Sequence, residues 1–380
     1  MSEDREVLQF FLDTDRDLLQ DAFRFAQHQV RETITRYPDF YPMYTKNGRW
    51  KHDGPAWTDW CDGFLPGMMF IFAKHSQNNG SGAFWLEQAT RYTKPLEHRK
   101  NDQDVHDLGF LFMSSYYRWL QLTREPALND ILIEAGRTMA IRYQSHGQYL
   151  CSFIAAESLF IDIMMNVGII FYAARETGDK QLRDLAMQHC LTTRRFLVRG
   201  DGSTAHEGIF NPETGEFLRQ STQQGYRSDS CWSRGLAWAI YGFTIAWEYS
   251  RDVRFLSTAE ACARYFLNHS NGDGIPPWDF TAPMPSRNLL DTSAAAIAAS
   301  ALLRLNRTVV DRDRAHIYWS AAILILRSLC EKYLAKKDKK WEGILKGGVY
   351  HVHRELGVDE SVMWGEYFFV EALGHVLRQI

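Results

Sequence analysis

The sequence predicts an all-α protein that folds as an (α/α)6 barrel, a ring of six inner helices surrounded by six outer ones. Two observations support this fold class. Segments with the 3.6-residue period of a helix follow one another along most of the 380 residues, and they alternate strictly between an amphipathic and an almost wholly apolar kind. No linker-like stretch divides the chain, so residues 1–380 are expected to form a single domain.

The amphipathic segments fit an outer ring, where one side of each helix meets water. In chain order they span 16–37, 84–98, 127–144, 179–198, 254–269 and 311–334. The apolar segments must be covered on all sides and fit an inner ring. They span 62–75, 107–122, 158–174, 232–250, 291–305 and 364–380. An open α-solenoid is the alternative, but it would bury its inner helices less completely. Strand-like alternation is limited to 216–222 and 348–353.

Polar motifs gather where the inner helices begin. Because each outer helix returns the chain, the inner helices all start at one end of the ring, where their positive dipole ends and the preceding loops meet. The motifs there are DWCDG at 59–63, HD at 106–107, SDSCWSRG at 228–235, LLDTS at 289–293 and MWGE at 363–366. One end of the barrel is therefore expected to hold the functional site.

Charge and composition argue against several classes of protein. The net charge is −3, and no basic run forms the stripe that nucleic acid requires. Six scattered cysteines without CxxC spacing fit reduced thiols better than a disulfide framework. No apolar stretch reaches the roughly 20 residues of a membrane span, and the charged N-terminus lacks a signal-peptide pattern. We expect a cytoplasmic protein, a monomer or weak homodimer, that binds neither nucleic acid nor membranes.

Asp162 stands alone as a charged residue in the apolar segment 158–174. Burying an isolated carboxylate costs several kcal/mol, so one is retained mainly where structure or chemistry requires it. The flanking residues, SLFI and IMM, supply no cation. A carboxyl group desolvated in this way has a raised pKa, as a proton donor near neutral pH needs. The structural alternative is a helix cap or a buried, hydrogen-bonded aspartate.

Asp107 is the first residue of the preceding inner segment, 107–122. Aspartate at the start of a helix often serves as a cap. If its side chain faces the same cavity as Asp162, the two carboxyl groups interact. One pKa then rises while the other group stays ionised, which gives an acid and its electrostatic partner. The two aspartates are therefore the candidate catalytic pair.

Further polar and aromatic residues could line the same cavity. His206 lies in a loop between the third and fourth inner segments, where it could also be a plain surface histidine. Gln224 and Arg234 precede and open the fourth inner segment, and they supply donors for hydroxyl and carboxylate groups. Trp60, Trp238 and Tyr350 could be stacking walls or core residues. His351 and His353 lack further ligands at useful spacing, so neither a metal nor another cofactor is expected.

A series of motifs in this order resembles the unsaturated glucuronyl hydrolases of glycoside hydrolase family 88. The series runs from about residue 57 to 375 and comprises WCDGF, HDLGFLF, the Asp162 segment with ARETGD, RRFLVRGDGS, QGYRSDSCWSRGLAWAIYGF, WDFTAP with RNLLDTSAAAIAASALL, and YHV with MWGEYFFVEAL. The resemblance implies an (α/α)6 barrel that removes a 4,5-unsaturated uronic acid from the non-reducing end of lyase-generated oligosaccharides. It also implies that the enzyme hydrates the vinyl ether, so the carboxylate-spacing rule for ordinary glycosidases does not apply.

The same resemblance implies residue roles. Asp162 matches the general acid/base that protonates C4 and activates the water that adds to C5, and Asp107 matches the second essential carboxylate. His206, Gln224 and Arg234 would contact the unsaturated uronate, with Trp60, Trp238 and Tyr350 as stacking walls. Two positions depart from the family pattern: Gln223 replaces a histidine or basic residue, and Leu236 replaces a frequent glutamine. A neutral residue at 223 weakens the case for a sulfate site there, although Arg354 and Ser361 lie in the loop 353–363.

Three alternatives remain from the sequence. An unsaturated rhamnogalacturonyl hydrolase would share the fold and the chemistry. A sugar 2-epimerase on the same type of barrel would need catalytic histidines in the cavity, for which His206 alone is thin support. A non-catalytic carbohydrate-binding toroid should tolerate the loss of Asp162, whereas a catalyst should not.

Overall fold

The computed structural model describes residues 3–52, 58–76 and 80–378, with side chains from residue 15 onwards. Its inner helices are α2 (Phe64–His75), α4 (Leu108–Ser114) with α5 (Tyr116–Thr123), α7 (Ile163–Asn166) with α8 (Gly168–Thr177), α10 (Ser233–Ser250), α12 (Thr292–Thr308) and α14 (Met363–Val376). The outer helices are α1 (Glu3–Arg36), α3 (Gly82–Thr93), α6 (Ala127–Ala140), α9 (Lys180–Phe196), α11 (Val253–His269) and α13 (Arg312–Ser328). Each predicted helical segment thus contains at least one helix.

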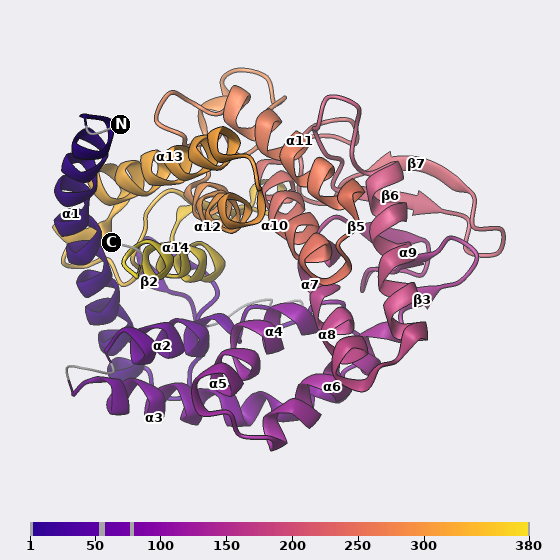
Figure 1. Ribbon diagram of the computed structural model, residues 1–380, viewed down its shortest axis with the longest axis horizontal. Helices are drawn as coiled ribbons and strands as arrows, with labels where there is room; N and C mark the ends of the chain where they lie inside the picture. The colour runs from indigo at the N-terminus through magenta and orange to yellow at the C-terminus, as the bar shows by residue number, and fades with distance from the viewer. Residues whose placement is uncertain (1–2, 53–57, 77–79, 379–380) are drawn as a thin grey trace.

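The inner helices form a closed ring. Each packs against the next in chain order, and α14 returns to pack against α2 (Figure 1). Each outer helix packs against an inner one, α3 on α2 and α11 on α10 for example. The predicted (α/α)6 barrel is confirmed, and ring closure excludes the open solenoid.

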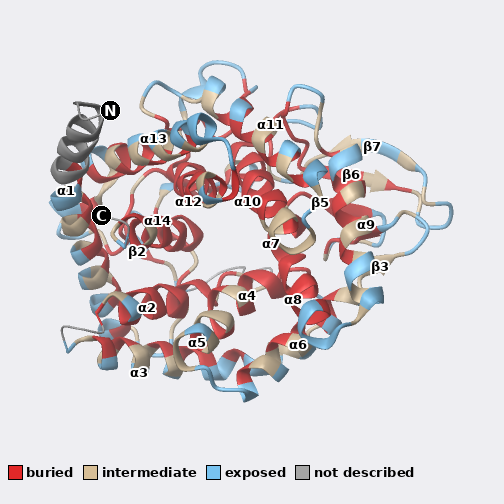
Figure 2. Ribbon diagram, viewed as in Figure 1, coloured by how far each residue is buried: buried red, intermediate tan, exposed pale blue. Residues whose placement is uncertain are grey.

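Burial follows the two kinds of segment. The inner helices α10, α12 and α14 are buried along nearly their whole length, whereas the outer helices expose one face (Figure 2). The apolar side chains of the inner ring therefore form the core. Within the described residues, no helix is both long enough and apolar enough to cross a membrane.

Short strands and turns connect the helices. The strands are β1 (Thr45–Lys46), β2 (Arg49–Trp50), β3 (Tyr143–Gln144), β4 (Tyr149–Leu150), β5 (Ser158–Phe160), β6 (Glu207–Phe210), β7 (Phe217–Ser221), β8 (Gly348–His351) and β9 (Leu356–Glu360). All the pairings are antiparallel, and β5, β6 and β7 form a three-stranded sheet in that order. The two strand segments expected from alternation correspond to β7 and β8. Short helices of the 3₁₀ or π type occur at Lys94–Asn101, Ser286–Asn288, Leu329–Tyr333, Ala335–Lys337 and Val352–Arg354.

Two expected inner helices are interrupted. The segment 158–174 begins as strand β5, and helix starts only at Ile163, because Ser158–Phe160 pair with Glu207–Ile209. All three β5 residues are buried, so their sequence shows no alternation to reveal a strand. The segment 107–122 breaks at Ser115, whose hydroxyl bonds the Leu111 carbonyl oxygen, a back-bond that often distorts helices.

Candidate active site

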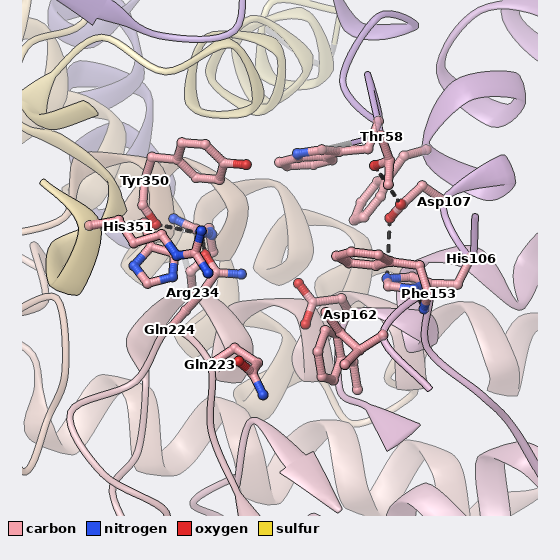
Figure 3. A pocket seen from close by; sticks show the side chains of 15 residues that line it. Thr58, His106, Asp107, Phe153, Asp162, Gln223, Gln224, Arg234, Tyr350 and His351 are labelled. Carbon is pink, nitrogen blue, oxygen red and sulfur yellow. Dashed lines mark hydrogen bonds and ion pairs between the residues drawn. The ribbon is translucent and has the colours of Figure 1, made fainter. Parts of the chain in front are cut away.

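A pocket opens at the end of the barrel where the inner helices begin, as the polar motifs predicted. Its empty space is about 710 Å³, and Figure 3 shows the side chains that surround it. The lining residues come from the loops and strands before α2, α4, α7, α10 and α14 and from the first turns of α4 and α10. They are Thr58, Trp60, His106, Asp107, Phe110, Phe153, Ile154, Phe160, Asp162, Gln223, Gln224, Arg234, Tyr350, His351 and Arg354.

The two helices that carry the aspartates approach each other closely. Asp107 is the residue before α4 and Asp162 the residue before α7. A Cβ atom at Gly109 would lie only 2.4 Å from the Asn166 Cα, so glycine permits this contact. The Asn166 Oδ1 accepts a hydrogen bond from the Phe110 backbone N–H at 2.7 Å. This contact fixes α4 against α7 and directs both carboxyl groups into one pocket (Figure 3).

Asp162 is paired with His206. The His206 Nδ1 accepts the backbone N–H of Gln223 at 3.0 Å, which assigns the ring proton to Nε2. This Nε2 lies 3.4 Å from Oδ2 of Asp162, a long contact of the kind that catalytic groups often show without substrate. His206 is buried just before β6, so it supports Asp162 and does not belong to the pocket lining. It is therefore not a surface loop histidine.

Asp107 has a matching partner in His106. The His106 Nδ1 accepts the Phe153 backbone N–H at 3.0 Å, so its proton also belongs on Nε2. That atom lies 3.3 Å from Oδ1 of Asp107, while Thr58 donates its hydroxyl proton to Oδ2 at 3.2 Å. Neither aspartate caps its helix with its side chain. The capping alternative is therefore wrong for both residues.

The two carboxyl groups have opposite pKa shifts. Burial raises the pKa of Asp107, and the negative charge of Asp162 contributes to the increase. Burial also acts to raise the pKa of Asp162, but its hydrogen bond and charge interaction with His206, together with His106 and Arg234, lower it overall. The expectation of a raised pKa at Asp162 is wrong, because the partners that lower it, His206, His106 and Arg234, come from distant parts of the chain and not from its flanks.

Arg234 supplies a buried positive charge on the other side of the pocket (Figure 3). Its guanidinium donates to the backbone carbonyls of Val349 and Tyr350, the latter at 3.0 Å, and to Oε1 of Gln224. Burial lowers the pKa of Arg234, while Asp291 and Asp162 act to raise it. These bonds hold the hairpin β8–β9 against α10 and place Gln224 at the pocket wall.

The three predicted stacking residues have different positions. Trp60 and Tyr350 line the pocket, and both rings pack on Trp364, with centroids 4.8 and 4.9 Å away. Trp238 is fully buried between Phe110 and Phe368 and is absent from the lining. Trp238 is therefore a core residue beneath the pocket, and its expected role as a stacking wall is corrected.

Sequence reasoning missed several lining residues, above all His106. Its position beside Asp107 in the HD motif was visible, but only the long-range bond from Phe153 reveals its orientation. Thr58 and Phe153 come from loops, and Phe160 and His351 from the ends of strands β5 and β8, without a chemical motif. Among the described residues, no group of three or more histidine, cysteine, aspartate or glutamate side chains could hold a metal ion.

Comparisons with known proteins agree on one family. The family model for Glycosyl Hydrolase Family 88 matches residues 26–339. The unsaturated glucuronyl hydrolase of Bacillus sp. (strain GL1) is 30% identical over 369 residues, covering 95% of this chain and 97% of that protein. The unsaturated chondroitin disaccharide hydrolase of Streptococcus pyogenes serotype M1 is 32% identical, covering 93% and 90%. The crystal structure of an unsaturated glucuronyl hydrolase specific for heparin matches with a TM-score of 0.87 at 28% identity, covering 96% and 98%.

Proposed function

The chain belongs to glycoside hydrolase family 88, and we propose that it uses Asp162 and Asp107 to hydrolyse unsaturated uronyl oligosaccharides. The reaction removes the 4,5-unsaturated uronic acid from the non-reducing end of oligosaccharides that polysaccharide lyases produce. The matched relatives are named for activities of this one kind. The family assignment favours this activity over the rhamnogalacturonyl hydrolase and the 2-epimerase.

One observation supports the residue roles best: the pocket is lined by two aspartates, and each of them is paired with a buried histidine. In each pair a backbone N–H fixes the histidine tautomer, and the histidine Nε2 orients the carboxyl group. Two carboxyl groups whose surroundings shift their pKa values in opposite directions are typical of acid–base catalysis. A carbohydrate-binding toroid would have no need of such pairs.

In the proposed reaction Asp162 donates its proton to C4 of the unsaturated uronate. The C4=C5 double bond is converted to a cation at C5 that the ring oxygen stabilises. Water adds to C5 and returns a proton to Asp162, so the catalyst is regenerated. The resulting hemiketal opens and releases the partner sugar. The protonated form of Asp107, favoured by its raised pKa, donates a hydrogen bond to the sugar.

The protonation of Asp162 depends on substrate in this scheme. In the free protein its lowered pKa keeps the carboxyl group ionised at neutral pH. A bound uronate places a second carboxylate nearby and removes water, and both changes favour the protonated form of Asp162. Arg234 lies on the opposite wall and attracts the uronate carboxylate through its field, and three of its five N–H donors are already bound to Gln224 and two carbonyls.

The central test is the variant Asp162→Asn. Asparagine keeps the shape and much of the hydrogen bonding but cannot supply a proton, so kcat should fall by about 10²- to 10⁴-fold or more. Turnover is followed through the ultraviolet absorbance of the C4=C5 bond, and folding through circular dichroism. Asp104→Asn, an exposed aspartate on the loop before Asp107, is the matched control and should keep wild-type turnover. Unchanged kcat in Asp162→Asn would refute the assignment.

The parent polysaccharide is tested with a panel of unsaturated disaccharides from chondroitin, heparin, hyaluronan, gellan and ulvan. We propose that unsulfated disaccharides react faster than their sulfated counterparts. Gln223 at the pocket wall is neutral, and its Nε2 already donates to Glu207 at 3.2 Å, so it adds little to sulfate binding. Faster turnover of the sulfated disaccharides would contradict this preference, and no turnover of any substrate would overturn the proposed function.

A further inference from the structure

A second hollow lies at the opposite end of the barrel, where the inner helices end. It consists of two adjoining cavities that share Arg118, Gln121, Arg307, Glu371 and His375. The charged residues that line it come from the C-terminal halves and ends of the inner helices, whereas the active-site pocket lies at their N-terminal ends. Phe110 lines both the active-site pocket and this hollow, so the aromatic core of the ring separates the two.

Cations outnumber carboxylates in this hollow. The lining carries five cationic side chains, Lys74, Arg118, Arg304, Arg307 and Arg378, but only two carboxylates, Glu248 and Glu371. Such an excess of one charge in a concave, partly apolar site concentrates ions of the opposite charge.

Both carboxylates are already paired with two of the five cations. Glu371 bonds Arg118, whose Nε also donates to the Tyr367 hydroxyl at 2.8 Å. Glu248 holds Arg304 through both carboxylate oxygens, with Nε at 2.9 and 3.0 Å from them. These pairs form a rigid floor with little negative charge left for further cations.

The other three cations form a rim around this floor. Among the described residues, no carboxylate oxygen lies within ion-pair distance of Lys74, Arg307 or Arg378. Arg378 donates to Nδ1 of His375 at 2.9 Å, and burial lowers the pKa of that histidine to about 3, so it brings no charge. Besides burial, neighbouring cations lower the pKa of Lys74 and of Arg378. Within the part of the chain that the structure describes, the rim therefore has no carboxylate as a counter-ion.

Helix ends explain only part of this arrangement. Lys74 and Arg307 lie in the last turns of α2 and α12, where a cation stabilises the helix dipole. A dipole is satisfied equally well by a cation that points to open water. It gives no reason for cations from three neighbouring helix ends to converge on one hollow with aromatic walls at Phe70, Tyr117 and Tyr249.

We propose that this hollow is a second binding site, which takes a small multivalent oxyanion with phosphate, sulfate or carboxylate groups. Lys74, Arg307 and Arg378 bind the anion by charge-assisted hydrogen bonds, and the Arg118–Glu371 and Arg304–Glu248 pairs hold the floor. The site lies outside the catalytic pocket and does not depend on the function proposed above.

The test is calorimetric titration of the full chain with pyrophosphate, sulfate and citrate at constant ionic strength, with chloride as the reference. We expect saturable binding of one anion per chain. The variant Arg307→Gln/Arg378→Gln should bind at least tenfold more weakly, because two charged contacts are lost. The matched control Arg219→Gln/Arg287→Gln removes two exposed arginines outside the hollow and should bind like the wild type.

Comparison of the three affinities distinguishes a site for phosphate from one for sulfate or for polycarboxylates. The anion with the highest affinity identifies the natural ligand class. The proposal is overturned if none of the anions saturates, or if both double variants lose the same affinity. It is also overturned if the Arg307→Gln/Arg378→Gln variant binds like the wild type and the anion competes with substrate, since the anion then occupies the catalytic pocket. Both variants should retain hydrolase activity, so failure here leaves the proposed function untouched.

Discussion

Replacing His206 by asparagine should raise the pKa of Asp162. The Oδ1 of asparagine is expected to occupy the place of the histidine Nδ1, so it can still accept the backbone N–H of Gln223. The shorter side chain has no donor at the position of Nε2, so the contact to Oδ2 of Asp162 is lost. Only burial and the more distant cations then act on this carboxyl group.

The magnitude follows from the contact that is removed. A hydrogen bond to a charged group contributes about 1.5–3 kcal/mol, and one pKa unit corresponds to about 1.4 kcal/mol. The Nε2–Oδ2 contact is long, at 3.4 Å, and neither atom has a well-aligned hydrogen bond, which favours the lower half of this range. We therefore expect the pKa of Asp162 to rise by about one to two units, back towards its ordinary value.

The assay is the pH dependence of kcat/KM, which reports ionisations of the free enzyme. If Asp162 must be protonated to react, kcat/KM falls as pH rises through its pKa, and this limb should move to higher pH by the same one to two units. The position of the limb is informative even if the variant binds substrate less well. His206→Gln is the control, because its amide can restore a donor near the Nε2 position. A limb that stays in place, or that moves equally in both variants, would refute the reasoning.

Four further predictions follow from the site and the core. Asp107→Asn should lower kcat/KM by about 10²-fold or more in the same assay, since asparagine has one acceptor oxygen where Asp107 uses two, towards His106 and Thr58. Trp238→Ala should cost about 3–5 kcal/mol of unfolding free energy in denaturant titrations, whereas Trp60→Ala should mainly raise KM; the reverse pattern would contradict their assigned positions. Arg234→Lys should destabilise by about 1–3 kcal/mol, because one ammonium cannot serve two carbonyls and Gln224. Burial lowers the pKa of His189 to about 3. Between about pH 6.5 and that value the unfolded chain therefore binds one more proton than the folded protein, so the free energy of unfolding falls as the pH drops. His189→Asn, which keeps an acceptor for the Leu150 N–H, should reduce the slope of unfolding free energy by up to about 1.4 kcal/mol per pH unit, and an unchanged slope would contradict this.

The architecture could be predicted because its evidence is local. A helix buried on all sides and a helix buried on one side leave different patterns within a single segment, and the strict alternation of the two kinds indicates a double ring. A three-residue strand that is wholly buried, such as β5, shows no alternation that would distinguish it from a helix. The apolar segment therefore predicts a helix from residue 158, five residues before the observed start at Ile163.

The kinds of helical segment and their order were enough to predict the barrel, the end that holds the pocket, and the two aspartates as the candidate pair. How those aspartates are held depends on contacts between distant parts of the chain. His206 lies 44 residues from Asp162, and the N–H that orients His106 comes from Phe153, 47 residues along the chain. The pKa of a buried carboxyl group depends on such partners over a few ångströms, whichever part of the chain supplies them. For the same reason the structure moved Trp238 from the pocket wall into the core and brought the cations of three helix ends into one hollow.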